Sequence, residues 1–225
     1  MNSDSWKMSK DAYAMLSSVT ESVGEKAKYN KYASDRKLRL FAVACYWQIS
    51  KDLQDDVTRS AVEIAEKYAE GYASYTELNN AKESVFNSSK ELGIIDSPVE
   101  ATESVRVAHY YALAALMPSS EQAARLACTG NGVFKCYTGK PADLLRCIIP
   151  NPFMPLPTID YTALPDHAIE LIVKGMYEKR CFDNMIIVGD ILELAGCDLR
   201  LTNHCHRPGP HARGCWVMDL VLGKS

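Results

Sequence analysis

The sequence has no long hydrophobic run, and none of its stretches approaches the roughly 18 consecutive apolar residues that indicate a membrane-spanning helix. Its first residues, MNSDSWKMSKDAYAML, lack the basic segment and apolar core of a secretory signal. Neither sign of charge is in large excess, because 25 Lys and Arg face 28 Asp and Glu. We therefore expect a cytoplasmic protein without a membrane partner. A general nucleic-acid binder is not expected, since it would have a strongly basic surface.

Signatures of the common catalytic and binding motifs are also missing. The sequence contains no C-x-x-C, G-x-G-x-x-G, H-E-x-x-H, G-x-S-x-G or EF-hand pattern. Segment 129–140 is rich in glycine, but its glycines lack the Walker spacing, and Pro141 follows Lys140 where Ser or Thr is required. No complete catalytic constellation is visible, so a non-catalytic role is favoured.

Helical periodicity dominates what is present. Apolar residues recur at spacings of three and four, as on one face of a helix, and no run alternates with period two. The pattern predicts an all-α protein, an irregular array of about eight to ten helices. The expected helices cover residues 34–53, 55–71, 74–93, 97–117, 120–128, 142–149, 165–180 and 183–196.

Several of these helices carry start or stop signals. Ser74 with Glu77, and Ser97 with Glu100, have the spacing of a capping box, and Asp183 is expected to cap the helix that follows it. Segments 129–140 and 203–214 are predicted to be loops because glycine and proline interrupt them.

A proline-rich strap, PNPFMPLP at residues 150–157, divides the chain. Four prolines in eight residues remove hydrogen-bond donors and favour extended backbone, so the strap is predicted to be non-helical. We expect residues 1–149 to form an N-terminal helical array. Residues 150–225 would hold the strap, two helices and a C-terminal His/Cys motif, packed with the array as one globular unit.

Cysteine is plentiful, with eight residues, but we expect thiols rather than disulfides. A chain without an export signal meets a reducing cytosol, where cysteines stay reduced. Cys45 lies in an amphipathic helical pattern, and Cys128, Cys147 and Cys197 lie at or near predicted helix ends. Most of the eight are therefore expected to be small buried hydrophobic residues.

The densest group of chemically reactive side chains lies near the C-terminus. His204, Cys205, His206, His211 and Cys215 fall within twelve residues, and they include three of the five histidines of the chain. Cysteine and histidine are the donors that zinc prefers in proteins. His204, Cys205, His211 and Cys215 are therefore the candidate zinc ligands.

A metal-free loop is the favoured alternative for this group. In that interpretation His204 and His211 bond backbone carbonyls, while Cys205 and Cys215 pack inward. The spacing matches no common zinc-finger module, and the PGP sequence at 208–210 restrains how the loop can surround an ion. A third interpretation is a thiolate enzyme in which Arg213 and a helix N-terminus activate Cys215.

A run of basic residues precedes the first strong helical pattern. It comprises Lys26, Lys28, Lys31, Arg36, Lys37 and Arg39, with Tyr29 and Tyr32 between them. Such a run can contact phosphates and bases, but a solvated helix start is the favoured interpretation, with Arg36, Lys37 and Arg39 at the surface. His109 is expected to be a packing residue. Asp183 and Asp190 stand two turns apart on one predicted helix, where paired acids could serve acid–base chemistry, but a capping role for Asp183 is favoured.

Two segments resemble an uncharacterised family of small proteins from planctomycete-type bacteria. They are SDRKLRLFAVAC at 34–45 and HCHRPGPHARGCWVMDLVLGK at 204–224, and the shorter NPF at 151–153 and LELAGCD at 192–198 fit the same order. The resemblance marks residues of both motifs, namely Asp35, Arg36, Lys37, Arg39, His204, Cys205, His211, Arg213, Gly214, Cys215, Trp216 and Asp219. His206 departs from the pattern, which has arginine there. No activity is established for that family, so the resemblance singles out residues and no reaction.

The sequence as a whole predicts a non-catalytic helical binding or assembly protein of the bacterial cytosol, with a protein partner. The alternative is a small enzyme or zinc-binding module that uses the C-terminal loop. His204, Cys205, His211, Arg213 and Cys215 are its candidate functional residues.

Overall fold

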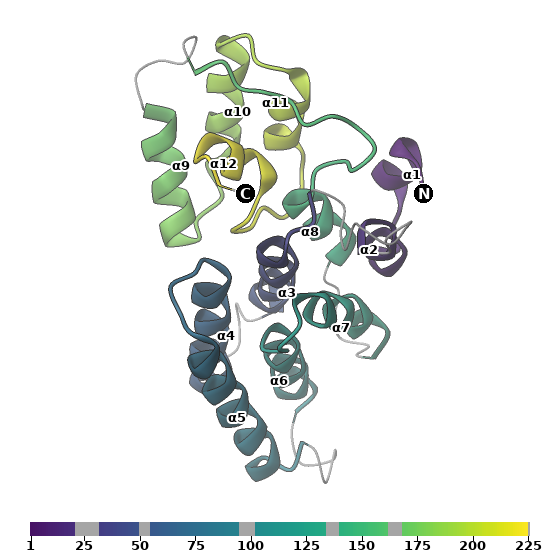
Figure 1. The fold of residues 1–225 in the computed structure, drawn as a ribbon, viewed down its shortest axis with the longest axis vertical. Helices are drawn as coiled ribbons and strands as arrows, with labels where there is room; N and C mark the ends of the chain where they lie inside the picture. Colours follow the sequence, from purple (N-terminus) through teal and green to yellow (C-terminus); the bar gives the residue numbers. More distant parts are fainter. Residues whose placement is uncertain (21–31, 50–54, 95–101, 134–139, 162–167, 225) are drawn as a thin grey trace. The chain divides into compact units, whose positions relative to one another are not determined.

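The computed structural model describes residues 1–20, 32–49, 55–94, 102–133, 140–161 and 168–224. Within these ranges it contains twelve α-helices and no strand, so the predicted all-α class is confirmed (Figure 1). In chain order the helices are α1 (Ser3–Met8), α2 (Ala12–Thr20), α3 (Asp35–Ile49), α4 (Asp56–Ala69), α5 (Tyr75–Glu91), α6 (Glu103–Ala115), α7 (Ser120–Val133), α8 (Pro141–Ile148), α9 (Ala168–Lys179), α10 (Met185–Leu194), α11 (Leu199–His206) and α12 (Trp216–Val221).

The chain forms two compact units, residues 11–142 and residues 1–10 together with 143–225. This division differs from the expected boundary in two ways: it falls after residue 142 and not after 149, and the first ten residues belong with the C-terminal part. Arg146 accounts for much of this, since its guanidinium donates to the carbonyls of Trp6 (3.0 Å) and Ser9 (2.7 Å). Asn151 adds a bond from its side-chain amide to the Ser3 hydroxyl (2.9 Å).

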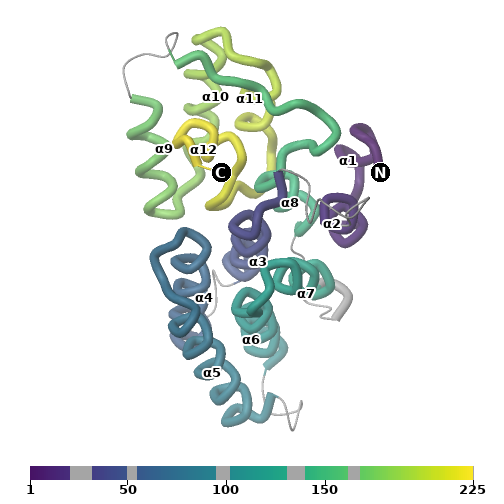
Figure 2. The backbone as a smooth tube through the Cα atoms, in the orientation of Figure 1, coloured from purple at the N-terminus to yellow at the C-terminus, as the bar shows by residue number. Residues whose placement is uncertain are grey.

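Helix α3 is the centre of the 11–142 unit. It packs against α4, α6 and α7, and the tube in Figure 2 shows these helices beside it. Every residue from Lys37 to Tyr46 is buried, so α3 is covered on all sides and not only along the single apolar face that the periodicity suggested. A helix buried all round can still hold polar side chains, provided that each of them finds a partner.

Helix ends in this unit follow local sequence signals closely. The capping box predicted at Ser74 is present: its hydroxyl accepts from the Glu77 amide (3.2 Å), and the Glu77 carboxylate accepts from the Ser74 amide (2.7 Å). Gly71 and Gly93 follow their helices with φ of 80° and 65°, the left-handed conformation that glycine adopts without strain. The capping box predicted at Ser97 lies outside the described residues, and the described helix α6 begins at Glu103, after Thr102.

Helix α7 runs farther than its sequence predicted. Residues 129–133 continue the helix, so the loop expected to begin at residue 129 is wrong over this part. Gly130 explains the extension, because it is buried against Tyr111 of α6 and a Cβ at this position would overlap the tyrosine ring and hydroxyl. The glycine thus permits close helix packing, an advantage that outweighs its low helix propensity.

The C-terminal part of the second unit also departs from the prediction at two helix ends. Helix α10 begins at Met185 after Asn184, without a side-chain cap, so the capping role expected of Asp183 is wrong. Helix α11 includes residues 203–206, which were expected to be loop. Asp198 caps α11 by accepting from the Arg200 amide (2.8 Å).

The core of this unit joins α8 to the last four helices. Its buried side chains include Cys147, Val173, Val188, Leu201 and Trp216. The strap at 150–157 is non-helical, as predicted, and Arg200 of α11 donates to the Pro155 carbonyl (2.6 Å). The final CWVMDLVLG segment is buried over most of α12.

Candidate metal centre

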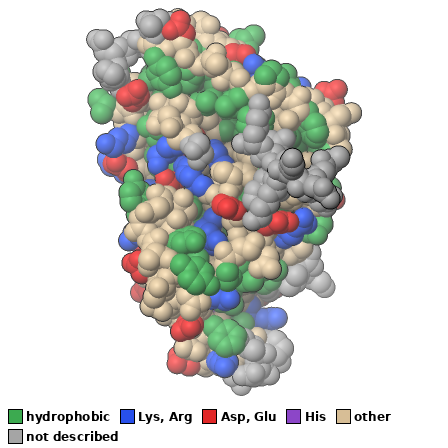
Figure 3. All heavy atoms as spheres, viewed as in Figure 1, with side chains coloured by type: hydrophobic (Ala, Val, Ile, Leu, Met, Phe, Trp, Pro, Cys, Tyr) green, Lys and Arg blue, Asp and Glu red, His purple; other side chains and the backbone are tan. Residues whose placement is uncertain are grey.

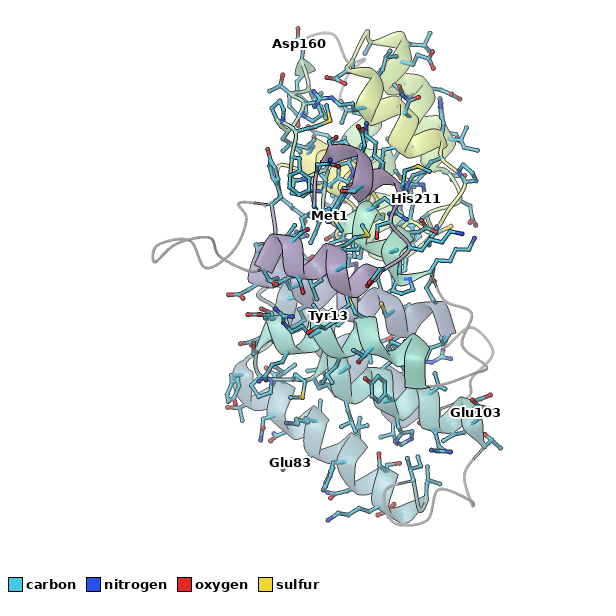
Figure 4. All side chains as sticks on the ribbon, turned by 90° about the vertical axis from the view of Figure 1, so that its right-hand side faces the viewer. Met1, Tyr13, Glu83, Glu103, Asp160 and His211 are labelled. Carbon is cyan, nitrogen blue, oxygen red and sulfur yellow. The ribbon has the colours of Figure 1, made fainter. Side chains whose placement is uncertain are left out.

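Four side chains from separate places in the C-terminal unit converge on one point. Cys147 lies near the end of α8, and His204 lies in the last turn of α11. His211, labelled in Figure 4, lies in the loop between α11 and α12, and Cys215 immediately precedes α12. One donor atom of each of these residues lies within 4.8 Å of the donor atoms of the other three.

Local backbone signals bring the loop residues back toward α11. Pro208 follows Arg207, and the residue before a proline avoids helical backbone, so Arg207 is extended at ψ 138° and the helix ends there. Gly214 then adopts φ 86° in the left-handed region, which favours glycine. Between these two points the chain turns and presents His211 and Cys215 to the end of α11.

The potential donor atoms of the cluster also lie close to one another in pairs. The His204 Nε2 atom lies 3.2 Å from the Cys215 sulfur, and the Cys147 sulfur lies 3.8 Å from His211 Nδ1. Cys147 and Cys215 are fully buried, His204 is 7% exposed and His211 is half-buried. Two sulfurs and two imidazoles are a donor set that zinc uses in tetrahedral sites.

The cluster corrects the predicted ligand set at one position. His204, His211 and Cys215 come together as predicted, but Cys205 is not a member and Cys147 takes its place. Cys205 is adjacent to His204 on α11, and adjacent helical residues point about 100° apart, so the two side chains cannot face the same ion. Nothing in the sequence around Cys147 indicated a metal ligand, because only the folded chain brings α8 to the C-terminal loop.

Burial decides the charge of these groups when no metal is present. It raises the pKa of the Cys215 thiol above its usual value and lowers the pKa of His204. It also raises the pKa of Cys205. These directions favour neutral thiols and a neutral imidazole, which counts against Cys215 as a free thiolate nucleophile. A bound metal ion reverses the balance, because a coordinating thiol loses its proton.

Arg213 does not serve the cluster as the thiolate interpretation required. Its guanidinium donates to the carbonyls of Tyr177 (2.6 Å) and Glu178 (3.1 Å) and stacks on the Tyr177 ring at 5.2 Å. These carbonyls lie in the last turn of α9, where a cation satisfies acceptors that the helix leaves free. Arg213 therefore anchors the loop to α9.

The basic residues of the 34–45 segment have structural partners as well, and their predicted exposure is wrong. Lys37 and Arg39 are 6% and 3% exposed, and Arg36 pairs with Glu70 at 2.8 Å with most of both side chains buried. Asp35 accepts a short hydrogen bond from Ser120. On the face drawn in Figure 3, basic side chains are interspersed with acidic ones. The basic surface expected from Arg36, Lys37 and Arg39 is therefore absent, and Lys26, Lys28 and Lys31 lie outside the described residues.

A second polar group lies in the 11–142 unit, and sequence reasoning missed it. His109 Nδ1 lies 2.7 Å from the Ser89 hydroxyl, and His109 Nε2 lies 2.9 Å from the Asp55 carboxylate. The order resembles a Ser–His–Asp relay, but Ser89 and His109 are both 1% exposed and the Ser89 hydroxyl also bonds the Val85 carbonyl (2.7 Å). This burial assigns the group to the packing of α5 and α6, as expected for His109.

A group of exposed titratable side chains lies on α10 and α11. Asp190, Glu193 and His206 come together at the surface, with His206 Nε2 3.0 Å from Asp190. Asp190 is therefore partnered by His206, and the alternative of an acid pair with Asp183 gains no support from the structure. Exposed acidic groups of this kind are ordinary surface features.

Comparison with family models, with curated proteins and with solved structures finds no match for this chain. Among the described residues, no helix combines the length and the apolar character needed to cross a bilayer.

Proposed function

We propose that this protein is a zinc-binding helical protein, with the ion bound within the cluster formed by Cys147, His204, His211 and Cys215. The supporting observation is the convergence of two buried thiols and two imidazoles, with one donor atom of each within 4.8 Å of the others. The ion would join α8, the end of α11 and the start of α12, the elements on which the core of this unit is built.

The chemistry of the donors selects the metal. Thiolate and imidazole suit zinc, whereas calcium and magnesium require oxygen donors. Two thiolates also neutralise the charge of a divalent ion, which a buried site needs. A metal-free loop explains the convergence less well, because His204 and His211 face sulfur atoms and not the backbone carbonyls that such a loop would supply.

His211 supplies a further argument for a missing partner. Its Nε2 atom is buried and has no hydrogen-bond partner among the described residues. A buried polar atom of this kind is destabilising by about 1–3 kcal/mol unless something satisfies it. An imidazole at a metal site commonly uses one nitrogen for the ion and the other for a hydrogen bond, so a metal ion is one partner that could satisfy a nitrogen of this ring.

The test compares two buried cysteines that differ in position but not in chemistry. The full chain, expressed in zinc-replete medium and purified without chelator, should hold about one zinc per chain. Cys147→Ser should fall below about 0.2 zinc per chain, because a hydroxyl is a poor replacement for a zinc-bound thiolate. Cys205→Ser should keep its zinc, since Cys205 is equally buried but lies outside the cluster.

Circular dichroism of both variants separates loss of the ligand from loss of the fold. A folded Cys147→Ser chain that retains zinc at the level of the parent would contradict the proposal, as would a parent chain that binds none. The broader prediction of a binding or assembly role stays a prediction alongside the zinc site.

A further inference from the structure

Trp216 determines which nitrogen of His204 carries the proton. The indole Nε1–H lies 2.9 Å from His204 Nδ1. An indole nitrogen can only donate, so Nδ1 must accept, and the proton of the neutral ring lies on Nε2. A proton on Nδ1 would face the indole N–H, and two donors would then oppose each other. His204 and Trp216 are only 7% and 8% exposed, so water has little access to separate these donors.

Packing holds the ring in this orientation. The His204 ring stands edge-to-face against Trp216 at 4.9 Å and against His211 at 5.2 Å. Turning the ring over would place carbon atoms toward both the indole N–H and the Cys215 sulfur, and both hydrogen bonds would be lost. The observed orientation is thus the one that satisfies the buried polar atoms on each side.

The Nε2–H group therefore points at the Cys215 sulfur, 3.2 Å away. A nitrogen that carries a proton has no free electron pair for an ion. It can instead donate to a metal-bound thiolate, as groups outside the ligand sphere do in metalloproteins. We infer, on the basis of the proposed zinc site, that His204 donates to Cys215, leaving Cys147, Cys215 and His211 as the protein ligands and water as the fourth.

This assignment changes the class of the site. A structural zinc site is closed by four protein ligands, whereas three protein ligands and a water are the arrangement of a reactive site. His211 is the half-buried member of the cluster, so we expect solvent to approach the ion from its side. With the other three members at 7% exposure or less, the exchangeable ligand must be small, such as water or a compact anion. His204 and Trp216 are then positioning residues.

The experiment uses the full chain with cobalt(II) in place of zinc, because cobalt reports its coordination optically. We expect azide to shift the visible absorption bands of the parent protein by replacing the water. X-ray absorption of the zinc form should show one imidazole and two sulfurs. Trp216→Phe keeps an aromatic ring but removes the indole donor, which frees His204 to bind through Nε2. Its spectrum should show two imidazoles and a lost or much weaker azide response.

His204→Gln provides the matched control, since its amide can still donate to Cys215. It should keep one metal ion per chain, with an affinity lowered by no more than about 100-fold. Cys215→Ser, which removes a ligand, should lose stoichiometric binding. Two imidazoles and no azide response in a metal-loaded parent would overturn this inference alone. A parent that binds neither cobalt nor zinc would overturn the proposed function as well.

Discussion

Arg39 illustrates how a charged side chain comes to lie inside a helical core. Its guanidinium donates to the carbonyls of Ala115 (2.7 Å), Met117 (2.8 Å) and Pro118 (3.1 Å) where α6 ends. Pro118 cannot continue the helix, so these carbonyls need outside donors. The ring of Tyr68 lies 5.1 Å from the guanidinium. Burial lowers the pKa of Arg39, but the pKa of a free guanidinium is so high that the group stays charged.

Replacing Arg39 should therefore destabilise the 11–142 unit strongly. We expect Arg39→Met to lower the free energy of unfolding by about 2–4 kcal/mol, because buried carbonyls would lose charged donors. Arg39→Lys should recover only part of this, since an ammonium cannot reproduce the planar fork. Urea unfolding followed by circular dichroism measures both changes. A loss below about 0.5 kcal/mol for Arg39→Met, typical of a surface site, would contradict the assignment.

Arg146 and Arg213 repeat this use of arginine in the other unit. Arg146 donates to carbonyls of Trp6 and Ser9 at the end of α1, and Arg213 donates to those of Tyr177 and Glu178 at the end of α9. The sequence marks such residues only as charged. The carbonyls that these arginines bind lie far away along the chain. Sequence patterns alone therefore predict that each arginine lies at the surface.

At the scale of single helices, close approach is decided by the smallest side chains. Gly130 lets α7 lie against Tyr111 of α6, with no room for a Cβ. We expect Gly130→Ala to destabilise the protein by about 1–3 kcal/mol, as overpacking does. Gly175→Ala in α9 is the matched control, because a Cβ there meets nothing within 4 Å. It should be neutral or stabilising by up to about 1 kcal/mol. Thermal unfolding of both variants is the measurement, and equal effects would refute the packing argument.

Sequence reasoning worked where the signal was local. The box of Ser74 and Glu77, the stop at Gly71 and the proline strap depend on neighbouring residues, and each is present in the structure. It failed where tertiary packing decides, as in the extension of α7 past residue 129 and the helical form of residues 203–206. Glycine and histidine are weak helix formers, and the buried contacts of these segments override that tendency.

The candidate site was predictable only in part for the same reason. His204, His211 and Cys215 stand close together in the sequence, so their grouping was visible. Cys147 lies near them only because the folded chain places α8 there. The hydrogen bond from the Trp216 indole to His204 can likewise be recognised only in the structure. The sequence therefore indicated Cys205, which is adjacent to His204 in the chain, whereas the structure places the distant Cys147 in the cluster.

At the scale of the whole molecule, metal binding should matter to one unit and not to the other. All four donors belong to the unit of residues 1–10 and 143–225. Removing zinc should therefore raise amide hydrogen exchange in α8, α11 and α12, because an ion stabilises the folded form that binds it. Exchange in α3, α4 and α5 should stay unchanged. Mass spectrometry of peptides before and after chelator treatment resolves the two units, and a uniform change throughout would contradict this division.

The most direct test of the metal centre is native mass spectrometry of the unmodified full chain, grown in zinc-replete medium and purified without chelator. We predict a dominant species carrying a single zinc ion, with accompanying loss of thiol protons, which mild acid converts to the metal-free mass. A dominant metal-free species that takes up no zinc on titration would contradict the account.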